Sequence, residues 1–249
     1  MVKTDKKQPF DIYDLHHLIV IYRKHPKMYE NLLCLPYFQG MSRDEITAIL
    51  DKVTLEFRNY PSGKEICHTG DRCDKFIIVI SGEVNTCATS PDGTYSLIEE
   101  IQAPLAIEPH SLFGKDTTFK RKYIAKEDCS ILLIDKHYLF SELTKYKIFT
   151  INFLNLISHR AQAQDHAIWN YTPTSIKGRI AQFIGMRSSC INGRKSLHIK
   201  MERLAALLCE TRLNVSKALN ELKDEGYIEL QRKEIVVPSL KKMIDGITS

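Results

Sequence analysis

Between residues 55 and 135 the apolar residues come in short β-rich runs separated by turns, and this pattern limits the fold more than any other feature of the chain. The run from Phe76 to Ile80 is continuously apolar, as a buried strand would be. Gly82 follows where a tight reversal needs a positive φ, and Asp92-Gly93 is a strong hairpin signal. Turn sequences recur at residues 60–63, 69–71, 81–83 and 91–93. We therefore expect an antiparallel roll or barrel.

Helical patterns precede this region. Ser42 and Glu45 have the spacing of a capping box, in which a hydroxyl and a carboxylate each accept from a backbone amide of the first turn. The apolar residues Ile46, Ile49, Leu50 and Val53 then recur at helical spacing. Residues 1–31 form an extension in which Ile12, Leu15, Ile19 and Tyr22 predict one apolar helix face, ended by Pro26. We expect this extension to pack on the roll or on a partner subunit.

From Ser141 to Trp169 the chain holds no glycine or proline, which predicts one long helix. Its later part, residues 160–166, is too polar for a monomeric core but suits a two-stranded seam. An amphipathic helix packed on its own roll is the alternative. The residues expected at the dimer interface are Phe149, Phe153, Leu156, Ile157, Arg160 and Gln164. Residues 170–174 break the helix and predict a hinge.

The last part of the chain has the pattern of a helix-turn-helix. Residues 201–208 predict a first helix, Cys209-Glu210 the turn, and Thr211 the cap of a second helix. Residues Val215, Ala218, Leu219 and Leu222 of the second helix must face inward, which leaves Arg212, Leu213, Ser216, Lys217 and Asn220 outward. Gly226 ends the helix, and residues 227–237 predict a hairpin with Arg232 and Lys233 at its tip.

The positive charge of the chain is C-terminal. From Pro173 onward 14 lysines and arginines face 8 acidic residues, giving +6, so residues 1–172 carry −1 of the total +5. This asymmetry favours a polyanionic partner for the last third. No run reaches the roughly 20 apolar residues of a membrane span, and the polar start leads into no signal-peptide core, so we expect a cytoplasmic protein with no membrane contact. The 7 cysteines stand singly, which predicts reduced thiols and no metal site.

The chain resembles the CRP/FNR family. Leu35-Pro36-Tyr37-Phe38, residues 60–63 and Ile80-Ser81-Gly82-Glu83-Val84 stand in that family's order, and residues 176–184 resemble the first helix of its C-terminal domain. The resemblance implies an α+β fold with an antiparallel β-roll sensor domain (32–140), a dimerisation helix (141–170) and a winged helix-turn-helix (171–249). It further implies a transcription regulator that is a homodimer and not an enzyme. Such a regulator would bind double-stranded DNA at a palindromic operator, with RNA polymerase as a further partner.

The resemblance also identifies candidate DNA contacts. Thr211-Arg212-Leu213-Asn214-Val215-Ser216-Lys217 keeps the cap, the first arginine, the valine and the final cation of the family pattern. We expect Arg212 to read guanine through two hydrogen bonds. Leu213 replaces the usual glutamate, so the preferred half-site should differ from the family's common one. Ser216 and Asn220 are further candidates, and Lys217, Arg232 and Lys233 are expected at backbone phosphates.

The sequence narrows the choice of effector without identifying it. Cyclic-nucleotide binders of the family use a Gly-Glu pair and an Arg followed by Ser or Thr, whereas here Ile107 precedes Glu108 and Lys122 follows Arg121. We therefore expect no tight cAMP binding, while Glu108 and Arg121 could form a modified anion site. Small organic effectors and haem stay open, with His16, His17 and His110 the first haem ligands to check. An iron–sulfur sensor is disfavoured because only Cys34 precedes residue 60.

Two other function classes are open. A cupin-like metal enzyme would need two histidines one residue apart with a downstream glutamate, and the predicted roll lacks this arrangement. A winged helix that binds protein instead of DNA is the second alternative. Titration with duplex DNA at two salt concentrations separates it from a DNA reader, because phosphate contacts make affinity fall steeply with salt.

Overall fold

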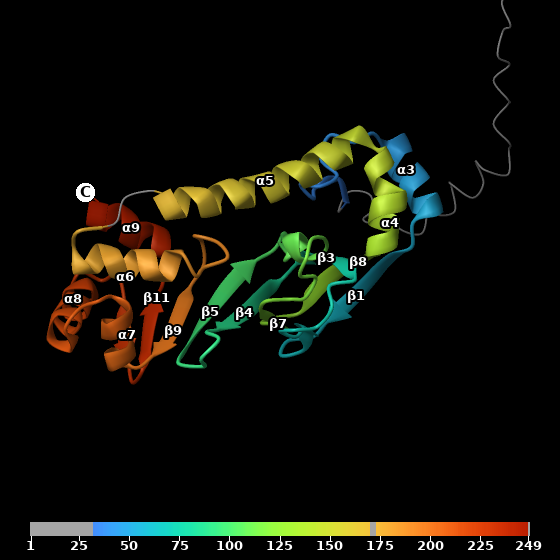
Figure 1. Ribbon diagram of the computed structural model, residues 1–249. Coiled ribbons are helices and arrows are strands. Elements are labelled where there is room, and N and C mark those ends of the chain that lie inside the picture. Colours follow the sequence, from blue (N-terminus) through green and yellow to red (C-terminus); the bar gives the residue numbers. More distant parts are fainter. Residues whose placement is uncertain (1–31, 170–172, 249) are drawn as a thin grey trace, which may run out of the picture.

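The computed structural model describes residues 32–169 and 173–248 (Figure 1). The predicted N-terminal helix, with His16 and His17, lies outside the described residues, as do most of the predicted hinge and the side chain of Gln164. A β-roll occupies one end of the molecule and a helical domain with a small sheet the other, while one long helix runs past both. The α+β architecture expected from the sequence is confirmed.

The roll is built from two antiparallel sheets. A four-stranded sheet has the order β1-β8-β3-β6, with bounds Leu55–Tyr60 (β1), Cys129–Asp135 (β8), Lys75–Ser81 (β3) and Leu105–Ile107 (β6). The second sheet contributes β5 (Tyr95–Gln102), β4 (Glu83–Thr89), β7 (Lys122–Ala125) and β2 (Glu65–Cys67), in that order. The expected buried strand is β3, in which Phe76, Ile78 and Val79 have no exposed surface.

The predicted turns are present. Gly82 has φ +97°, and a Cβ there would lie 2.7 Å from both the Asp128 carbonyl oxygen and the Cys129 sulfur, so only glycine fits between β3 and β4. Gly93 has φ +65° at the end of the β4–β5 hairpin. The capping box is also formed, because Ser42 Oγ accepts from the Glu45 amide and Glu45 accepts from the Ser42 amide at the start of α3 (Arg43–Lys52).

The long helix starts later than expected. In place of one helix from residue 141 there are α4 (Lys136–Ser141), a 3-10 turn η2 (Leu143–Lys145) and then α5 (Lys147–Trp169). Tyr146 has extended φ and ψ of −93° and 112°, which interrupts the helix. The Thr150 hydroxyl donates to the Thr144 carbonyl, 2.9 Å away, and Leu143 is fully buried. The break thus anchors the chain on the roll before α5 leaves it.

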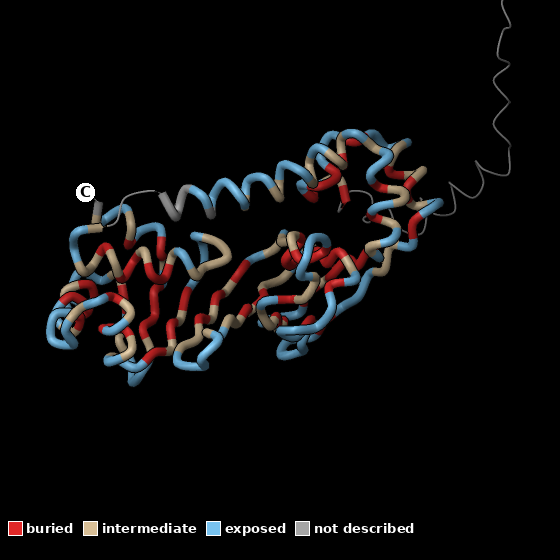
Figure 2. The backbone as a smooth tube through the Cα atoms, in the orientation of Figure 1, coloured by how far each residue is buried: buried red, intermediate tan, exposed pale blue. Residues whose placement is uncertain are grey.

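The first half of α5 packs on its own roll, which corrects one predicted interface residue. Phe149 has no exposed surface and contacts Phe38, with ring centroids 5.4 Å apart. Phe153 packs edge-on against Phe76, at 5.6 Å. Phe149 therefore belongs to the roll core rather than to an exposed seam. Between residues 154 and 165 most of the described side chains of α5 are exposed (Figure 2).

The C-terminal domain is a winged helix-turn-helix. Its helices are α6 (Ile176–Gly185), α7 (Met201–Leu207), α8 (Arg212–Asp224) and α9 (Leu240–Thr248), and its strands are β9 (Lys195–Ile199), β10 (Glu229–Gln231) and β11 (Glu234–Val237). Strands β10 and β11 form the predicted wing and pair with β9 in the order β10-β11-β9. Gly226, with φ +78°, follows α8 as expected.

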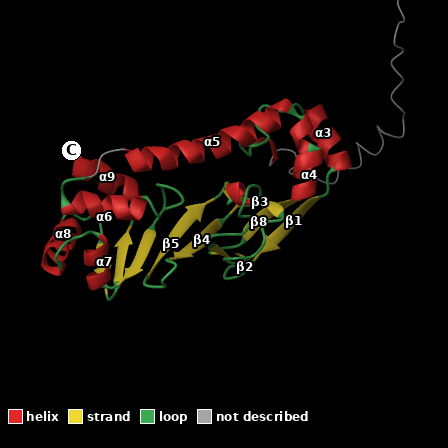
Figure 3. Cartoon of the chain, in the orientation of Figure 1, coloured by secondary structure: helices red, strands yellow, loops and turns green. Residues whose placement is uncertain are grey.

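The two domains share one sheet, which the sequence did not predict. Strand β5 of the roll pairs with β9 of the C-terminal domain over the register Tyr95–Ile199 to Glu99–Lys195, so the second sheet continues through seven strands (Figure 3). Leu97 of β5 is 1% exposed and lies in the hydrophobic core of the C-terminal domain. The winged helix is thus joined to its own roll by backbone pairing as well as by the chain after α5.

Candidate nucleic-acid interface and effector site

Helix α8 is held by its buried face and capped at its start. Thr211 has extended φ and ψ of −73° and 147°, and its Oγ accepts from the Asn214 amide at 3.2 Å. The four predicted inward residues, Val215, Ala218, Leu219 and Leu222, are all buried. Because these residues fix the rotation of α8 about its axis, the side chains of its opposite face are presented to solvent.

The structure places the candidate readers on that opposite face. Leu213 is 79% exposed, which is unusual for a large apolar side chain and suits a surface that another molecule covers. The side chain of Arg212 is 67% exposed. Of the remaining candidates on α8 and its cap, Thr211, Lys217 and Asn220 are exposed and Ser216 is half-buried.

The wing completes a groove beside the helix-turn-helix. Arg232 and Lys233 form the exposed tip between β10 and β11, and Lys233 adopts φ +62° to make the tight turn. A groove of about 350 Å³ lies between the two helices and the wing. Three cations, Lys200, Arg212 and Lys233, line it together with two carboxylates, Glu202 and Glu234, so the groove carries both signs of charge with a small positive excess.

A second set of polar groups lies in the roll around Glu108. Glu108 is 2% exposed and has φ +37° and ψ +55°, a left-handed conformation that costs a non-glycine residue free energy and gathers at functional sites. Its Oε2 accepts from the Lys120 amide at 2.7 Å and from the Ser111 hydroxyl at 3.2 Å. Its Oε1 is buried without a hydrogen-bond partner in the part of the chain that the structure describes. A buried, half-satisfied carboxylate is costly unless a ligand donates to it.

His110 stands two residues after Glu108, and Arg160 of α5 lies within electrostatic range of both. Within the described residues neither His110 Nδ1 nor Arg160 Nε has a hydrogen-bond partner, although both atoms are buried. Burial and the nearby charges of Arg160, Arg121 and Lys120 lower the pKa of His110 to about 4, so this imidazole is neutral at pH 7. Burial also lowers the pKa of Arg160, while Tyr123 and Glu108 oppose that shift. The cluster therefore offers one unpaired acceptor, one unpaired guanidinium donor and a neutral imidazole to a small polar molecule.

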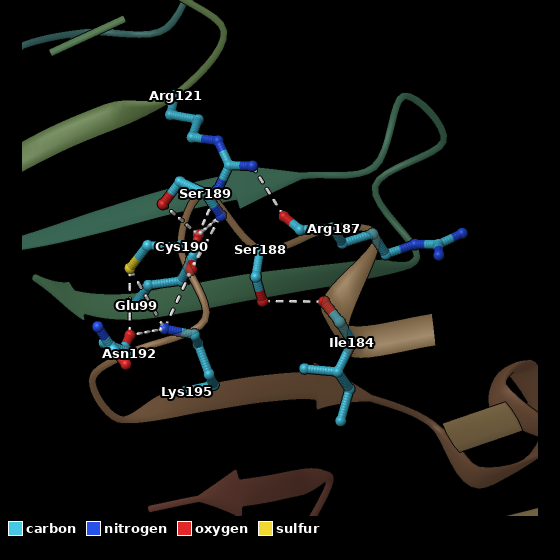
Figure 4. Close-up of polar contacts among 9 residues, drawn as sticks. All are labelled: Glu99, Arg121, Ile184, Arg187, Ser188, Ser189, Cys190, Asn192 and Lys195. Carbon is cyan, nitrogen blue, oxygen red and sulfur yellow. Dashed lines mark hydrogen bonds and ion pairs between the residues drawn. The ribbon is translucent and has the colours of Figure 1, made fainter. Parts of the chain in front are cut away.

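Arg121 is already engaged. Its Nη1 lies 2.5 Å from Glu99 Oε1, and its Nη2 donates to the Arg187 carbonyl at 2.8 Å. The guanidinium therefore contacts the loop between α6 and β9, as Figure 4 shows. Sequence reasoning placed Arg160 on the dimer seam and missed its proximity to Glu108, because only the fold brings α5 over the roll. Glu99 and Lys195 were missed as well, since nothing in the sequence signals the pairing of β5 with β9.

The solvent side of α5 carries an apolar stripe. Ile151 and Leu154 are 57% and 56% exposed, and the small exposed residues Ser158 and Ala161 follow at steps of four and three residues. These steps match the seam of a two-stranded coiled coil. The exposed stripe is rotated from the predicted set, in which Phe153, Leu156, Ile157 and Arg160 are half-buried in their own protomer.

Within residues 32–169 and 173–248, no three His, Cys, Asp or Glu side chains are grouped so that they could hold a metal ion. No helix in these ranges has the length and apolar character to cross a membrane.

Comparison with known proteins agrees with this organisation. Residues 57–146 match the family model of the cyclic nucleotide-binding domain, and residues 178–245 match that of the Crp-like helix-turn-helix domain. The chain is 22% identical over 217 residues to the CRP-like cAMP-activated global transcriptional regulator of Mycobacterium tuberculosis, covering 83% of this chain and 93% of that protein. It is 25% identical over 201 residues to the Cyclic AMP receptor protein of Thermus thermophilus, covering 78% and 88%.

Among solved structures, the Thermus thermophilus Catabolite Activator Protein aligns with a TM-score of 0.45 and 20% identity, over 86% of this chain and all of that chain. The chain belongs to the CRP/FNR family of transcription regulators, with a cyclic nucleotide-binding domain followed by a helix-turn-helix DNA-binding domain. Members of this family are regulators and not enzymes.

Proposed function

We propose that this protein is a homodimeric, sequence-specific regulator whose roll senses a small polar effector other than cAMP. The observation that carries the DNA-reading part is the two-faced helix α8, with Leu219 and Leu222 fully buried on one side and Arg212 and Leu213 exposed on the other. A helix of this kind can enter the major groove by its N-terminal end, as the recognition helix of the catabolite activator protein does in the same family. Ser216, Lys217 and Asn220 follow on the same face, and Arg232 and Lys233 flank it from the wing.

Dimerisation through α5 is supported by the stripe that begins with Ile151 and Leu154. Two copies packed along it would bury apolar side chains that one copy leaves in water. A symmetric pair of winged helices then reads a palindromic operator, because the two-fold axis of the protein must match that of the DNA. RNA polymerase is the further partner proposed for a regulator bound in this way. The domain limits proposed are 32–140, 141–170 and 171–249.

The effector is proposed to bind at Glu108, His110 and Arg160. Three buried polar atoms without partners among the described residues support a ligand there that both donates and accepts hydrogen bonds. Binding of cAMP is disfavoured because Arg121, the residue aligned with the family's phosphate-binding arginine, already donates to Glu99 and Arg187. Glu108 also takes its left-handed conformation without the glycine that precedes the glutamate in cAMP-binding relatives.

Selection of operators from randomised duplex DNA, followed by titration at two salt concentrations, tests the DNA-reading proposal. A selected palindrome whose binding weakens steeply with salt is the expected result. Failure to enrich any sequence, together with salt-independent binding, would show that the winged helix has another partner. Isothermal calorimetry with cAMP and an absorption spectrum of freshly purified protein test the effector: micromolar cAMP saturation would refute the proposal, and a Soret band would identify haem instead.

A further inference from the structure

A charged cluster is buried where the roll meets the DNA-binding domain. Glu99 on β5 and Lys195 on β9 both have no exposed surface, and Lys195 Nζ lies 3.3 Å from Glu99 Oε2. Arg121, just before β7, supplies a second cation to the same carboxylate at 2.5 Å. The cluster therefore joins β5 and the residue before β7 in the roll to β9 of the DNA-binding domain (Figure 4).

Glu99 has hydrogen bonds from the loop before β9 as well. The Ser189 amide donates to both carboxylate oxygens, at 2.9 and 3.0 Å, and the Ser189 hydroxyl donates to Oε1 at 2.9 Å. Lys195 is held in turn by the Asn192 carbonyl. The carboxylate of Glu99 thus finds partners across the junction, in Ser189 and Lys195, and undocking would leave these charged groups to be rehydrated separately.

The backbone is fitted closely around these charges. Gly193 has φ +79°, and a Cβ there would lie 2.0 Å from the Glu100 carbonyl oxygen. The Glu100 amide also donates to the Arg194 carbonyl at 3.0 Å. Nearer the hairpin turn, Arg203 of α7 lies 2.5 Å from Asp92, an exposed pair that contributes little by itself. The buried end of the interface is therefore the part that fixes the register of β5 against β9.

We propose that Glu99 is a positioning residue that holds the DNA-binding domain on the roll, and that Arg121 connects this junction to the effector site. Arg121 directly follows Lys120, whose amide donates to Glu108 at 2.7 Å, and its guanidinium contacts the Arg187 carbonyl of the DNA-binding domain. A ligand that draws Arg121 toward Glu108 would remove one of the two cations from Glu99 and loosen the docking. The connection to the effector rests on the proposed function, whereas the docking role does not.

Hydrogen exchange of the full-length protein, followed by mass spectrometry, tests the docking role. In E99Q the amides of β5 and β9 should exchange at least about tenfold faster, because a buried lysine and arginine lose their shared anion. Amides of α8 and β3 should keep their wild-type rates. The matched control is E100Q on the same strand, whose carboxylate pairs with Lys126 inside the roll, 2.7 Å away, and which should leave β9 unchanged.

Wild-type exchange in E99Q, or acceleration spread equally over α6, α8 and β9, would overturn the docking role. If E99Q does not fold, R121Q carries the test, because it keeps the pair between Glu99 and Lys195 and should give a smaller acceleration confined to β5 and β9. An R121Q protein with unchanged exchange would refute the role of Arg121. The measurement uses neither DNA nor effector, so its failure is distinguishable from a failure of the proposed function.

Discussion

The guanidinium of Arg212 lies 3.3 Å from the carboxylate of Glu202, joining the first turns of α8 and α7. Both side chains are more than half exposed, so the pair adds little stability and leaves the arginine free to exchange partners. Replacing Arg212 by Ala should lower the ratio of cognate to scrambled operator affinity by about 5- to 150-fold, corresponding to about 1–3 kcal/mol. Competition binding measures this ratio. The control K223A, on an exposed residue in the last turn of α8, should leave the ratio unchanged.

Leu213 sets a second expectation about specificity. Because leucine can contact a thymine methyl but cannot accept a hydrogen bond, L213E should shift the selected base at its position toward cytosine, whose amino group donates to a carboxylate. Parallel selections from randomised duplexes with both proteins measure the shift. The control L213M keeps an apolar side chain and should select the wild-type sequence. Identical selections for L213E and wild type would place Leu213 outside the base-reading surface.

Lys217 and Arg232 should act on affinity rather than on specificity. If each neutralises one phosphate in each subunit, K217A or R232A should weaken binding to all sequences about equally and reduce the slope of log affinity against log salt by about 0.9 per lost contact. Titrations at several salt concentrations give the slope. A loss of affinity confined to one operator sequence would instead assign the residue to base reading.

His110 predicts a specific pH dependence of stability. Its pKa is lowered from 6.5 to about 4 in the folded protein, so the unfolded chain binds a proton first as the pH falls. The folded state therefore loses stability between about pH 6.5 and pH 4, and the neutral form is favoured above that window. Denaturant unfolding of H110Q should show a shallower decline over this window than wild type. Substitution of the exposed His137 by Gln should leave the wild-type slope.

The exposed stripe on α5 predicts the oligomeric state. L154D places two carboxylates in the proposed seam and removes two leucines, each worth about 1.5–3 kcal/mol when buried, so it should convert the dimer to monomers. Light scattering coupled to gel filtration measures the mass. F140D changes an even more exposed residue on α4, 71% accessible, and should remain dimeric. A dimeric L154D would locate the interface elsewhere.

Much of the fold could be predicted from local sequence patterns. The turn at Gly82, the cap at Thr211 and the inward set around Leu219 are each determined within a few neighbouring residues, and the structure confirms them. The start of α5 could not be predicted in this way, because the segment before it contains no helix-breaking residue. The helix is interrupted there by the hydrogen bond from the Thr150 hydroxyl to the Thr144 carbonyl and by the burial of Leu143.

Contacts between residues far apart in the sequence could not be predicted either. Arg160 has helical spacing suited to a seam, yet it lies within electrostatic range of Glu108 because the first half of α5 packs on the roll. Glu99 alternates within an ordinary strand pattern, and only the pairing of β5 with β9 brings Lys195 and Ser189 to it. Contacts of this kind depend on residues about 90 positions apart, for which a single sequence carries no periodic signal.

The position of Leu97 bears on how such a protein can be divided or recombined. A fragment that begins at the hinge would lack this side chain, leaving a hollow in the core that contains Ile180, Leu197 and Ile235, and an open strand edge on β9. The isolated DNA-binding domain would then tend to aggregate by pairing of β9 with β9 of other copies. A chimaera that exchanges the DNA-binding domain for that of another regulator would therefore have to include β5 of the roll. The smallest part of this protein that can be exchanged intact is thus larger than the DNA-binding domain alone.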